Sequence, residues 1–111
     1  MTFTAKPDPQ RIWAVIQAIP RGETASYGQV AMRAGLPGRA RWVAQLLASG
    51  QGPVGLPWHR VVRSDGRIAF DPDSAGYLEQ VQRLRAEGIP VTAGKVRLTD
   101  TRRNLDEALW R

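Results

Sequence analysis

The segment GLPWHRVV, residues 55–62, contains the chain's single histidine, His59, between Trp58 and Arg60. An imidazole exchanges protons near neutral pH, so the run Pro-x-His-Arg-Val-Val is consistent with a reactive site. Covalent chemistry there also needs a nucleophile such as a thiolate or a hydroxyl, and an indole ring does not supply one. The same residues are consistent with a structural histidine whose ring is partly buried and hydrogen-bonded.

Composition excludes several kinds of chemistry. The chain has no cysteine, which removes disulfides, thiolate metal ligands and thiol nucleophiles together. With one histidine we expect no metal site, and we expect no cofactor. The 111 residues suit a single domain, residues 1–111, with one core. No apolar run approaches the roughly 20 residues that span a bilayer, and the N-terminus lacks the apolar region of a signal peptide, so a cytoplasmic location is expected.

Positive charge is concentrated in the middle of the chain. Lys and Arg number 16 against 10 Asp and Glu, a net charge of +6. Between residues 32 and 67 the only acid is Asp65, and the arginines are Arg33, Arg39, Arg41, Arg60, Arg63 and Arg67. A basic segment on a small domain favours a polyanionic partner, nucleic acid first. A solvated, arginine-rich surface would give the same pattern.

The elements that position this segment begin with a helix. Apolar residues at positions 12, 15, 16 and 19 recur with helical period. Asp8 is suited to cap this helix, Pro9 to begin it and Pro20 to end it. Trp13 adjoins the apolar stripe, so we expect it in the core and not in a functional site.

Two short helices across a tight turn follow. Ser26 can cap a helix that runs to Ala34, residues 35–38 form a turn, and a second helix is predicted from about Arg39 to Ser49. This is the outline of a helix-turn-helix. In the second helix, positions 43, 46 and 47 face inward. Another face has small and polar side chains that could approach a partner closely: Arg41, Ala44, Gln45 and Ala48. An ordinary amphipathic helix with an exposed arginine has the same pattern.

A small hairpin and a third helix complete the prediction. Val61-Val62 is expected to pair with Arg67–Phe70 across a turn at residues 64–66, as in the wing of a winged helix. The third helix begins after Ser74 and ends at Gly88, with positions 77, 78, 81 and 84 toward the core. In the tail, KVRLT is consistent with a strand and RRNLDEALW with a last helical turn. The predicted fold class is therefore mainly α, a winged helix-turn-helix DNA-binding domain with a small β-hairpin wing.

Three motifs in this order, SYGQVA, RARWVAQLL and PWHRVV, resemble the C-terminal domain of O6-alkylguanine-DNA alkyltransferases. The resemblance extends from about Arg11 to Gly88. PWHRV in particular is similar to the alkyltransferase-like proteins, in which tryptophan stands where the transferases have their acceptor cysteine. Trp58 occupies that position here, and no matching acceptor is present.

The resemblance implies roles for the residues around Trp58. In the transferases, the histidine after the cysteine relays charge through water to a glutamate on a later helix, and the thiolate attacks the alkyl group. The matching pair is His59 and Glu87, and with tryptophan at the acceptor position both are expected to be structural, as is Arg60. The predicted lesion pocket is Pro57, Trp58, His59, Arg60, Val61 and Glu87, with no catalytic residue.

The resemblance also assigns contacts with DNA. Tyr27 matches the tyrosine at the phosphate beside the lesion, and Arg41 matches the arginine that enters the base stack in place of the flipped nucleotide. The predicted DNA-binding and flipping residues are Tyr27, Arg41, Ala44, Gln45 and Ala48, and the predicted phosphate contacts are Arg39, Arg63 and Arg67. Some relatives have a basic residue near the bound base. This chain has Phe70-Asp71 there, and Phe70 offers a stacking or lid surface instead.

Together these features predict a non-enzymatic protein that binds O6-alkylguanine in duplex DNA by nucleotide flipping and marks it for nucleotide excision repair. Flipping costs a few kcal/mol, and less where pairing is already weakened. Stacking on Trp58 returns on the order of 1–3 kcal/mol. The expected partners are double-stranded DNA containing O6-alkylguanine and, by implication of the family, nucleotide excision repair proteins. A monomer is expected.

Two other functions stay open at this point. One is an enzyme, either a transferase with another acceptor or a hydrolase that uses His59 and Glu87, and the missing nucleophile counts against it. The other is a winged-helix regulator that binds a defined DNA sequence. Such regulators commonly dimerise, and no dimerisation helix is evident in the sequence.

Overall fold

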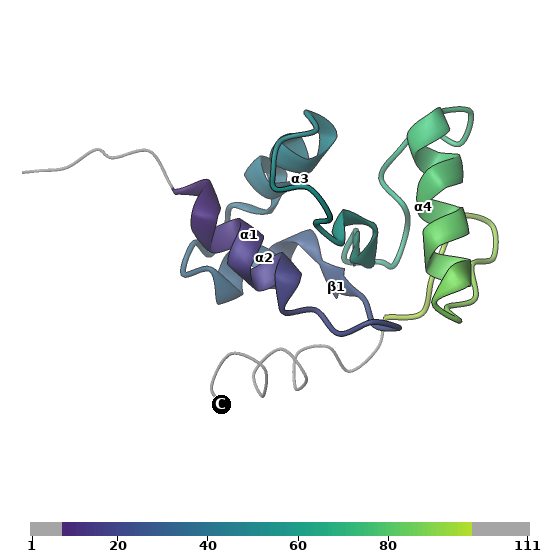
Figure 1. Cartoon of the computed structure of the whole chain (residues 1–111), viewed down its shortest axis with the longest axis horizontal. Coiled ribbons are helices and arrows are strands. Elements are labelled where there is room, and N and C mark those ends of the chain that lie inside the picture. Colours follow the sequence, from purple (N-terminus) through teal and green to yellow (C-terminus); the bar gives the residue numbers. More distant parts are fainter. Residues whose placement is uncertain (1–7, 99–111) are drawn as a thin grey trace, which may run out of the picture.

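The structure is a computed structural model that describes residues 8–98. Within this range the chain is mainly helical, as predicted (Figure 1). The elements are α1 Pro9–Gln17, β1 Ala25–Ser26, α2 Tyr27–Arg33, α3 Ala40–Ala48, the short 3-10 helix η1 Trp58–Arg60, β2 Val61–Val62 and α4 Ala75–Ala86. Among these described residues, no helix is both long and apolar enough to cross a membrane.

Short polar side chains begin three of the helices, as predicted. The Asp8 carboxylate accepts from the N–H of Gln10 at 2.9 Å at the start of α1. The Ser26 hydroxyl accepts from the N–H of Gln29 at 3.1 Å at the start of α2, and the Gln29 side chain accepts from the N–H of Ser26 at 2.9 Å. Ser74 caps α4 in the same way. Each cap satisfies an N–H group that the helix cannot satisfy itself, so these helix starts are determined locally.

The predicted helix-turn-helix is confirmed. Helices α2 and α3 pack against each other, and α1 packs against α2. The turn between them contains Gly35 at φ +79° and Gly38 at φ +83°. Both lie in the left-handed region, which a residue without Cβ adopts without strain. Trp13 is buried in the core, and Trp42 packs at its edge.

The core consists of two hydrophobic clusters, where the sequence predicted one. The larger is built from α1, α2 and α3 around residues such as Ile16, and the smaller packs under α4 around Leu84. Strand β2 joins them, because successive side chains of a strand point to opposite sides. Val61 belongs to the larger cluster and Val62 to the smaller, and both are fully buried. Figure 1 shows α4 on the other side of η1 from α1, α2 and α3.

The predicted hairpin is wrong in its strand pairing, although its turn is correct. The N–H of Arg63 donates to the carbonyl of Arg67 at 2.9 Å across residues 64–66. Strand β2, however, pairs in parallel with β1, with Ala25 opposite Val61, and residues 67–70 form no strand. The physical reason is burial: pairing with β1 places both valines of β2 inside, between the two clusters.

In place of the predicted strand pairing, a turn at residues 92–96 packs against residues 66–68. Arg67 forms an isolated β-bridge with Lys95, the N–H of Ile68 donates to Gly94 O at 2.9 Å, and the N–H of Val96 donates to Gly66 O at 2.9 Å. The predicted KVRLT strand is not formed in residues 95–98. In this range only Lys95 makes β-bridges, with Arg67 and with Thr92. Thr99 and the predicted helical turn in RRNLDEALW lie outside the described residues.

One core position of α4 was predicted wrongly. Val81 and Leu84 are buried, but Leu78 is 58 % exposed and Gln80 is buried in its place. Residues 77, 81 and 84 already cover the face toward the smaller cluster, and Leu78 lies off that stripe. The side chain of Gln80 is satisfied inside because its Nε2 donates to the carbonyls of His59 and Val61, each at 3.0 Å.

Candidate functional site

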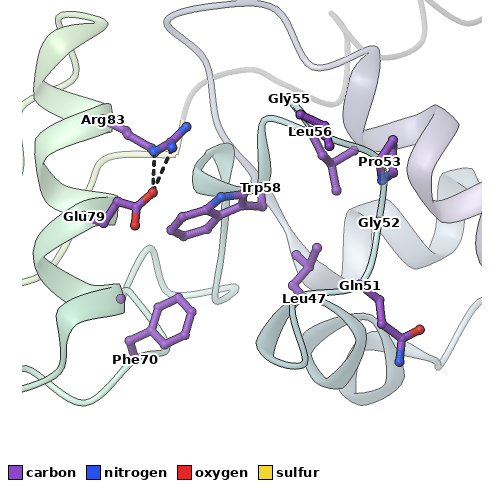
Figure 2. A pocket seen from close by; sticks show the side chains of 13 residues that line it. Leu47, Gln51, Gly52, Pro53, Gly55, Leu56, Trp58, Phe70, Glu79 and Arg83 are labelled. Atoms are coloured by element: carbon purple, nitrogen blue, oxygen red, sulfur yellow. Dashed lines mark hydrogen bonds and ion pairs between the residues drawn. The ribbon is translucent and has the colours of Figure 1, made fainter.

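A cavity of about 450 Å³ opens between α4 and the loop of residues 50–56, with Trp58 inside it (Figure 2). Leu47, Pro53 and Leu56 form an apolar wall on the loop side. Glu79 and Arg83 of α4 form the facing wall. None of the described residues lining this cavity carries a hydroxyl, a thiol or an amine.

The indole of Trp58 is held between two neighbours. Phe70 meets it edge to face, with ring centroids 5.9 Å apart and planes at 83°. This edge-to-face geometry is favourable for aromatic pairs. The guanidinium carbon of Arg83 lies 5.7 Å from the indole centroid, within the range of a cation–π contact. Phe70 thus provides the aromatic surface that the sequence suggested.

Next to Trp58, a buried polar network closes around the carboxylate of Glu87. His59 Nε2 lies 2.7 Å from Glu87 Oε2. Arg60 donates from Nε to Oε1 at 3.0 Å and from Nη2 to Oε2 at 2.8 Å. The N–H of Gly22 donates to Oε1 at 3.0 Å. The Glu87 side chain is 6 % exposed, so this full set of donors replaces the water that the carboxylate loses.

The network fixes the protonation of its members. Burial alone would raise the pKa of Glu87, but hydrogen bonds from Arg60, Gly22 and His59 outweigh it and lower that pKa to about 2. Burial lowers the pKa of His59, and Glu87 only partly opposes this shift. At neutral pH Glu87 is therefore ionised and His59 is neutral. Because the carboxylate only accepts, the proton of His59 is on Nε2 and its Nδ1 is unprotonated.

The same network joins the two hydrophobic clusters. Arg60 Nη1 donates to the carbonyl of Ile19, after α1, at 2.9 Å, while its other donors hold Glu87 at the end of α4. Gln80 of α4 binds the carbonyls of His59 and Val61. These bonds set the position of α4 relative to η1, and therefore the width of the cavity between α4 and the loop.

A hollow along α3 leads into this cavity. It is lined by Tyr27, Arg41, Ala44, Gln45, Leu47, Ala48, Trp58, Ala69 and Phe70. Leu47, Trp58 and Phe70 belong to both. Arg41, Gln45 and Ala48 are exposed and Ala44 is half-buried. The structure thus brings all five predicted DNA-binding and flipping residues to one surface that is continuous with the cavity.

Tyr27 stands at the far end of that surface. Its ring packs against the larger cluster, and burial raises the pKa of its phenol while Arg63 partly opposes the shift. The phenol is therefore neutral at physiological pH and able to donate a hydrogen bond. A second hollow shares Tyr27 and Arg41 with the α3 hollow, and Arg63 lines it as well. The predicted phosphate contact Arg63 is thus beside the predicted flipping residues.

The other predicted phosphate contacts lie farther out. Arg67 lines a third hollow, together with Arg63 and Lys95. Arg39 is exposed at the start of α3, where its side chain caps no N–H, and it lines neither the cavity nor these three hollows.

Known proteins similar to this chain include a family model, curated relatives and solved structures. The family model of the 6-O-methylguanine DNA methyltransferase DNA-binding domain matches residues 7–89. A DNA base-flipping protein of Vibrio parahaemolyticus is 42 % identical over 89 residues, which cover 79 % of this chain and 87 % of that protein. A crystal structure of S. pombe Atl1 in complex with damaged DNA containing O6-carboxymethylguanine matches with a TM-score of 0.70 at 31 % identity, over 92 % of this chain and 93 % of that one. The chain belongs to the alkyltransferase-like proteins.

The chain is also similar to proteins that are named as enzymes. A methylated-DNA–protein-cysteine methyltransferase of Mycolicibacterium paratuberculosis is 40 % identical over 79 residues, which are 45 % of that protein. The alkyltransferase-like chain thus resembles proteins named for base flipping and proteins named for methyl transfer.

Of the six residues of the predicted pocket, the structure places one in the cavity and five outside its lining. Trp58 lines the cavity, and the other five are Pro57, His59, Arg60, Val61 and Glu87. Pro57 is half-buried at the start of η1. Sequence reasoning missed Leu47, Glu79 and Arg83, which line the cavity. The spacing of Glu79 and Arg83, four residues apart on a predicted helix, predicts an ion pair on the helix surface and does not indicate a cavity wall.

Proposed function

We propose that this protein recognises O6-alkylguanine in duplex DNA by flipping the modified nucleotide into the cavity beside Trp58, and that it leaves the DNA chemically unchanged. The observation that carries the proposal is the cavity itself: an indole, and no thiol, is present where the family resemblance puts the acceptor. The cavity is also continuous with the α3 surface.

Nucleotide flipping assigns a task to each side chain of that surface. The phenol of Tyr27 donates to the phosphate beside the lesion, which favours rotation of the nucleotide. Arg41, exposed on α3, enters the base stack and fills the space that the flipped base leaves. The small side chains of Ala44 and Ala48 let α3 approach the groove closely enough for Arg41 to reach the stack.

Discrimination follows from the energies of extrusion and capture. A base must leave the duplex to be inspected, at a cost of a few kcal/mol that falls when pairing is already weakened. Stacking against aromatic side chains such as Trp58 returns on the order of 1–3 kcal/mol. The alkyl group gains contact with the apolar wall of Leu47, Pro53 and Leu56. Arg39, Arg63 and Arg67 add phosphate contacts that do not depend on the lesion.

Because the proposed mechanism has no covalent step, it leaves the lesion for other proteins to remove. A protein that binds a lesion without removing it must pass it on, so we propose that the complex marks the site for nucleotide excision repair proteins. We propose further that the protein acts as a monomer in the cytoplasm. A continuous face on one chain provides every residue that the flipping mechanism uses.

The deciding experiment is a binding titration with two duplexes at one salt concentration. They share one sequence and differ only in having O6-methylguanine or guanine. We expect tighter binding of the modified duplex, with the masses of protein and DNA unchanged after incubation. Equal affinities for the two duplexes would contradict lesion recognition. Dealkylated DNA or an added alkyl mass on the protein would show an enzyme, and enrichment of a motif from random duplexes would show a sequence-specific regulator.

A further inference from the structure

Among the described residues that line the cavity, the charged side chains are Glu79 and Arg83, and both come from α4. Arg83 Nε and Nη2 each lie 2.8 Å from Glu79 Oε2. The two side chains are 50 % and 48 % exposed. The pair therefore borders water, and little free energy is needed to separate it.

The position of Arg83 is nevertheless well defined. Its guanidinium lies over the indole of Trp58 while its N–H groups hold Glu79 (Figure 2). A guanidinium can hold a carboxylate through two N–H groups, and in Arg83 both of these groups are directed at Glu79 Oε2. Arg83 thus places a cation on the α4 wall of the cavity.

We propose that Arg83 determines specificity for O6 adducts that end in a carboxylate, and that Glu79 weakens the binding of those adducts by competing for Arg83. The inference rests on the proposed function, because it concerns which modified base the cavity accepts. A neutral alkyl adduct lies against the apolar wall and leaves the Glu79–Arg83 pair intact. A carboxylate adduct displaces Glu79 from the guanidinium and takes its place.

Competition for one guanidinium has a distinctive consequence. Replacing Glu79 with a neutral residue frees the donors of Arg83 and removes a negative charge from the wall, so carboxylate adducts bind more tightly. Replacing Arg83 leaves Glu79 facing the adduct without a counter-charge, so they bind more weakly. The two variants therefore shift selectivity in opposite directions, which a purely structural pair would not do.

The test uses three duplexes of one sequence, containing guanine, O6-carboxymethylguanine or its neutral amide counterpart, O6-carbamoylmethylguanine. Dissociation constants are measured by fluorescence anisotropy at one salt concentration for the wild type, Glu79→Gln, Arg83→Gln and Arg85→Gln. Arg85 is the matched control, because it lies on the same helix, does not line the cavity and donates to the carbonyl of Val91 at 2.9 Å. Taking the ratio of the two adduct constants removes general effects of charge on DNA binding.

We expect Glu79→Gln to shift this ratio toward the carboxymethyl adduct by about threefold to fivefold. Arg83→Gln should shift it toward the amide by about tenfold, and Arg85→Gln should leave it within about twofold. If both adducts bind more tightly than guanine but neither Glu79→Gln nor Arg83→Gln moves the ratio, the inference is overturned and the proposed function stands. If the wild type binds all three duplexes equally, the proposed function fails and the inference fails with it.

Discussion

Two arginine–glutamate pairs near Trp58 have the same closest distance but differ in burial. Arg60 and Glu87 approach to 2.8 Å, and so do Arg83 and Glu79. The Glu87 side chain is 6 % exposed and accepts from Arg60, His59 and the N–H of Gly22. The Glu79 side chain is 50 % exposed and pairs with Arg83 across one turn of α4.

The difference shows that an ion pair's role depends on burial more than on its length. A buried charge that loses its partner has no water to replace it, so breaking the pair typically costs roughly 3–5 kcal/mol. An exposed pair contributes about 0–1 kcal/mol, because water solvates each partner nearly as well. The buried Arg60–Glu87 pair, the inner pair, can therefore hold α4 in place. The exposed Arg83–Glu79 pair, the outer pair, can exchange partners with a ligand.

The strongest test of this contrast compares two matched variants. We expect Glu87→Gln to lower the free energy of unfolding by roughly 3 kcal/mol, because it leaves the Arg60 guanidinium without its counter-charge. Glu79→Gln should lower it by less than about 1 kcal/mol. Urea denaturation monitored by tryptophan fluorescence measures both. Similar losses in the two variants would mean that burial does not separate the pairs.

Acid should remove the stability that the buried Arg60–Glu87 pair contributes. The pKa of Glu87 is lowered from 4.5 to about 2, so its contribution is present above pH 4.5 and is lost as the pH falls toward 2. A shift of this size corresponds to roughly 3 kcal/mol. The lowered pKa of His59 acts in the same direction, since the unfolded chain takes up a proton below pH 6.5 and the folded chain resists it. Thermal unfolding from pH 7 to 3 should show falling stability, with a smaller fall in Glu87→Gln.

On the outer side, Trp58 is expected to control selectivity. Trp58→Ala removes the aromatic surface inside the cavity, and we expect the preference for O6-methylguanine over guanine duplex to fall by about tenfold. Trp58→Phe should retain most of the preference, because a phenyl ring still stacks. Titration of both duplexes against the two variants measures the ratio. A preference that survives Trp58→Ala would place the flipped base elsewhere.

The smallest expected effect is on the affinity of Arg41→Ala for DNA, and it distinguishes nucleotide flipping from electrostatic attraction to any duplex. Arg41→Ala should reduce affinity for damaged duplex about fivefold more than for intact duplex, because the vacated space in the stack is left unfilled. Arg63→Ala should weaken both equally and reduce the slope of log K against log salt by about 1. Equal effects of Arg41→Ala on the two duplexes would remove Arg41 from the flipping mechanism.

Much of this protein could be predicted from local sequence. Asp8, Ser26 and Ser74 begin their helices through hydrogen bonds to residues two or three positions away, so their neighbours in sequence are sufficient to specify them. The glycines of the turn at residues 35–38 are equally local. The match of Trp58 to the acceptor position could likewise be recognised from the motif that contains it.

The tertiary structure decided what depends on contacts between distant segments. Strand β2 pairs with β1 and not with residues 67–70, because only that pairing buries both Val61 and Val62 between two clusters. Gln80 is inside because the carbonyls of His59 and Val61 need donors there. Glu79 and Arg83 look like an ordinary helix-surface pair in sequence. They become a wall of the cavity only because the Glu87 network holds α4 across from Trp58, and no local pattern encodes that distance.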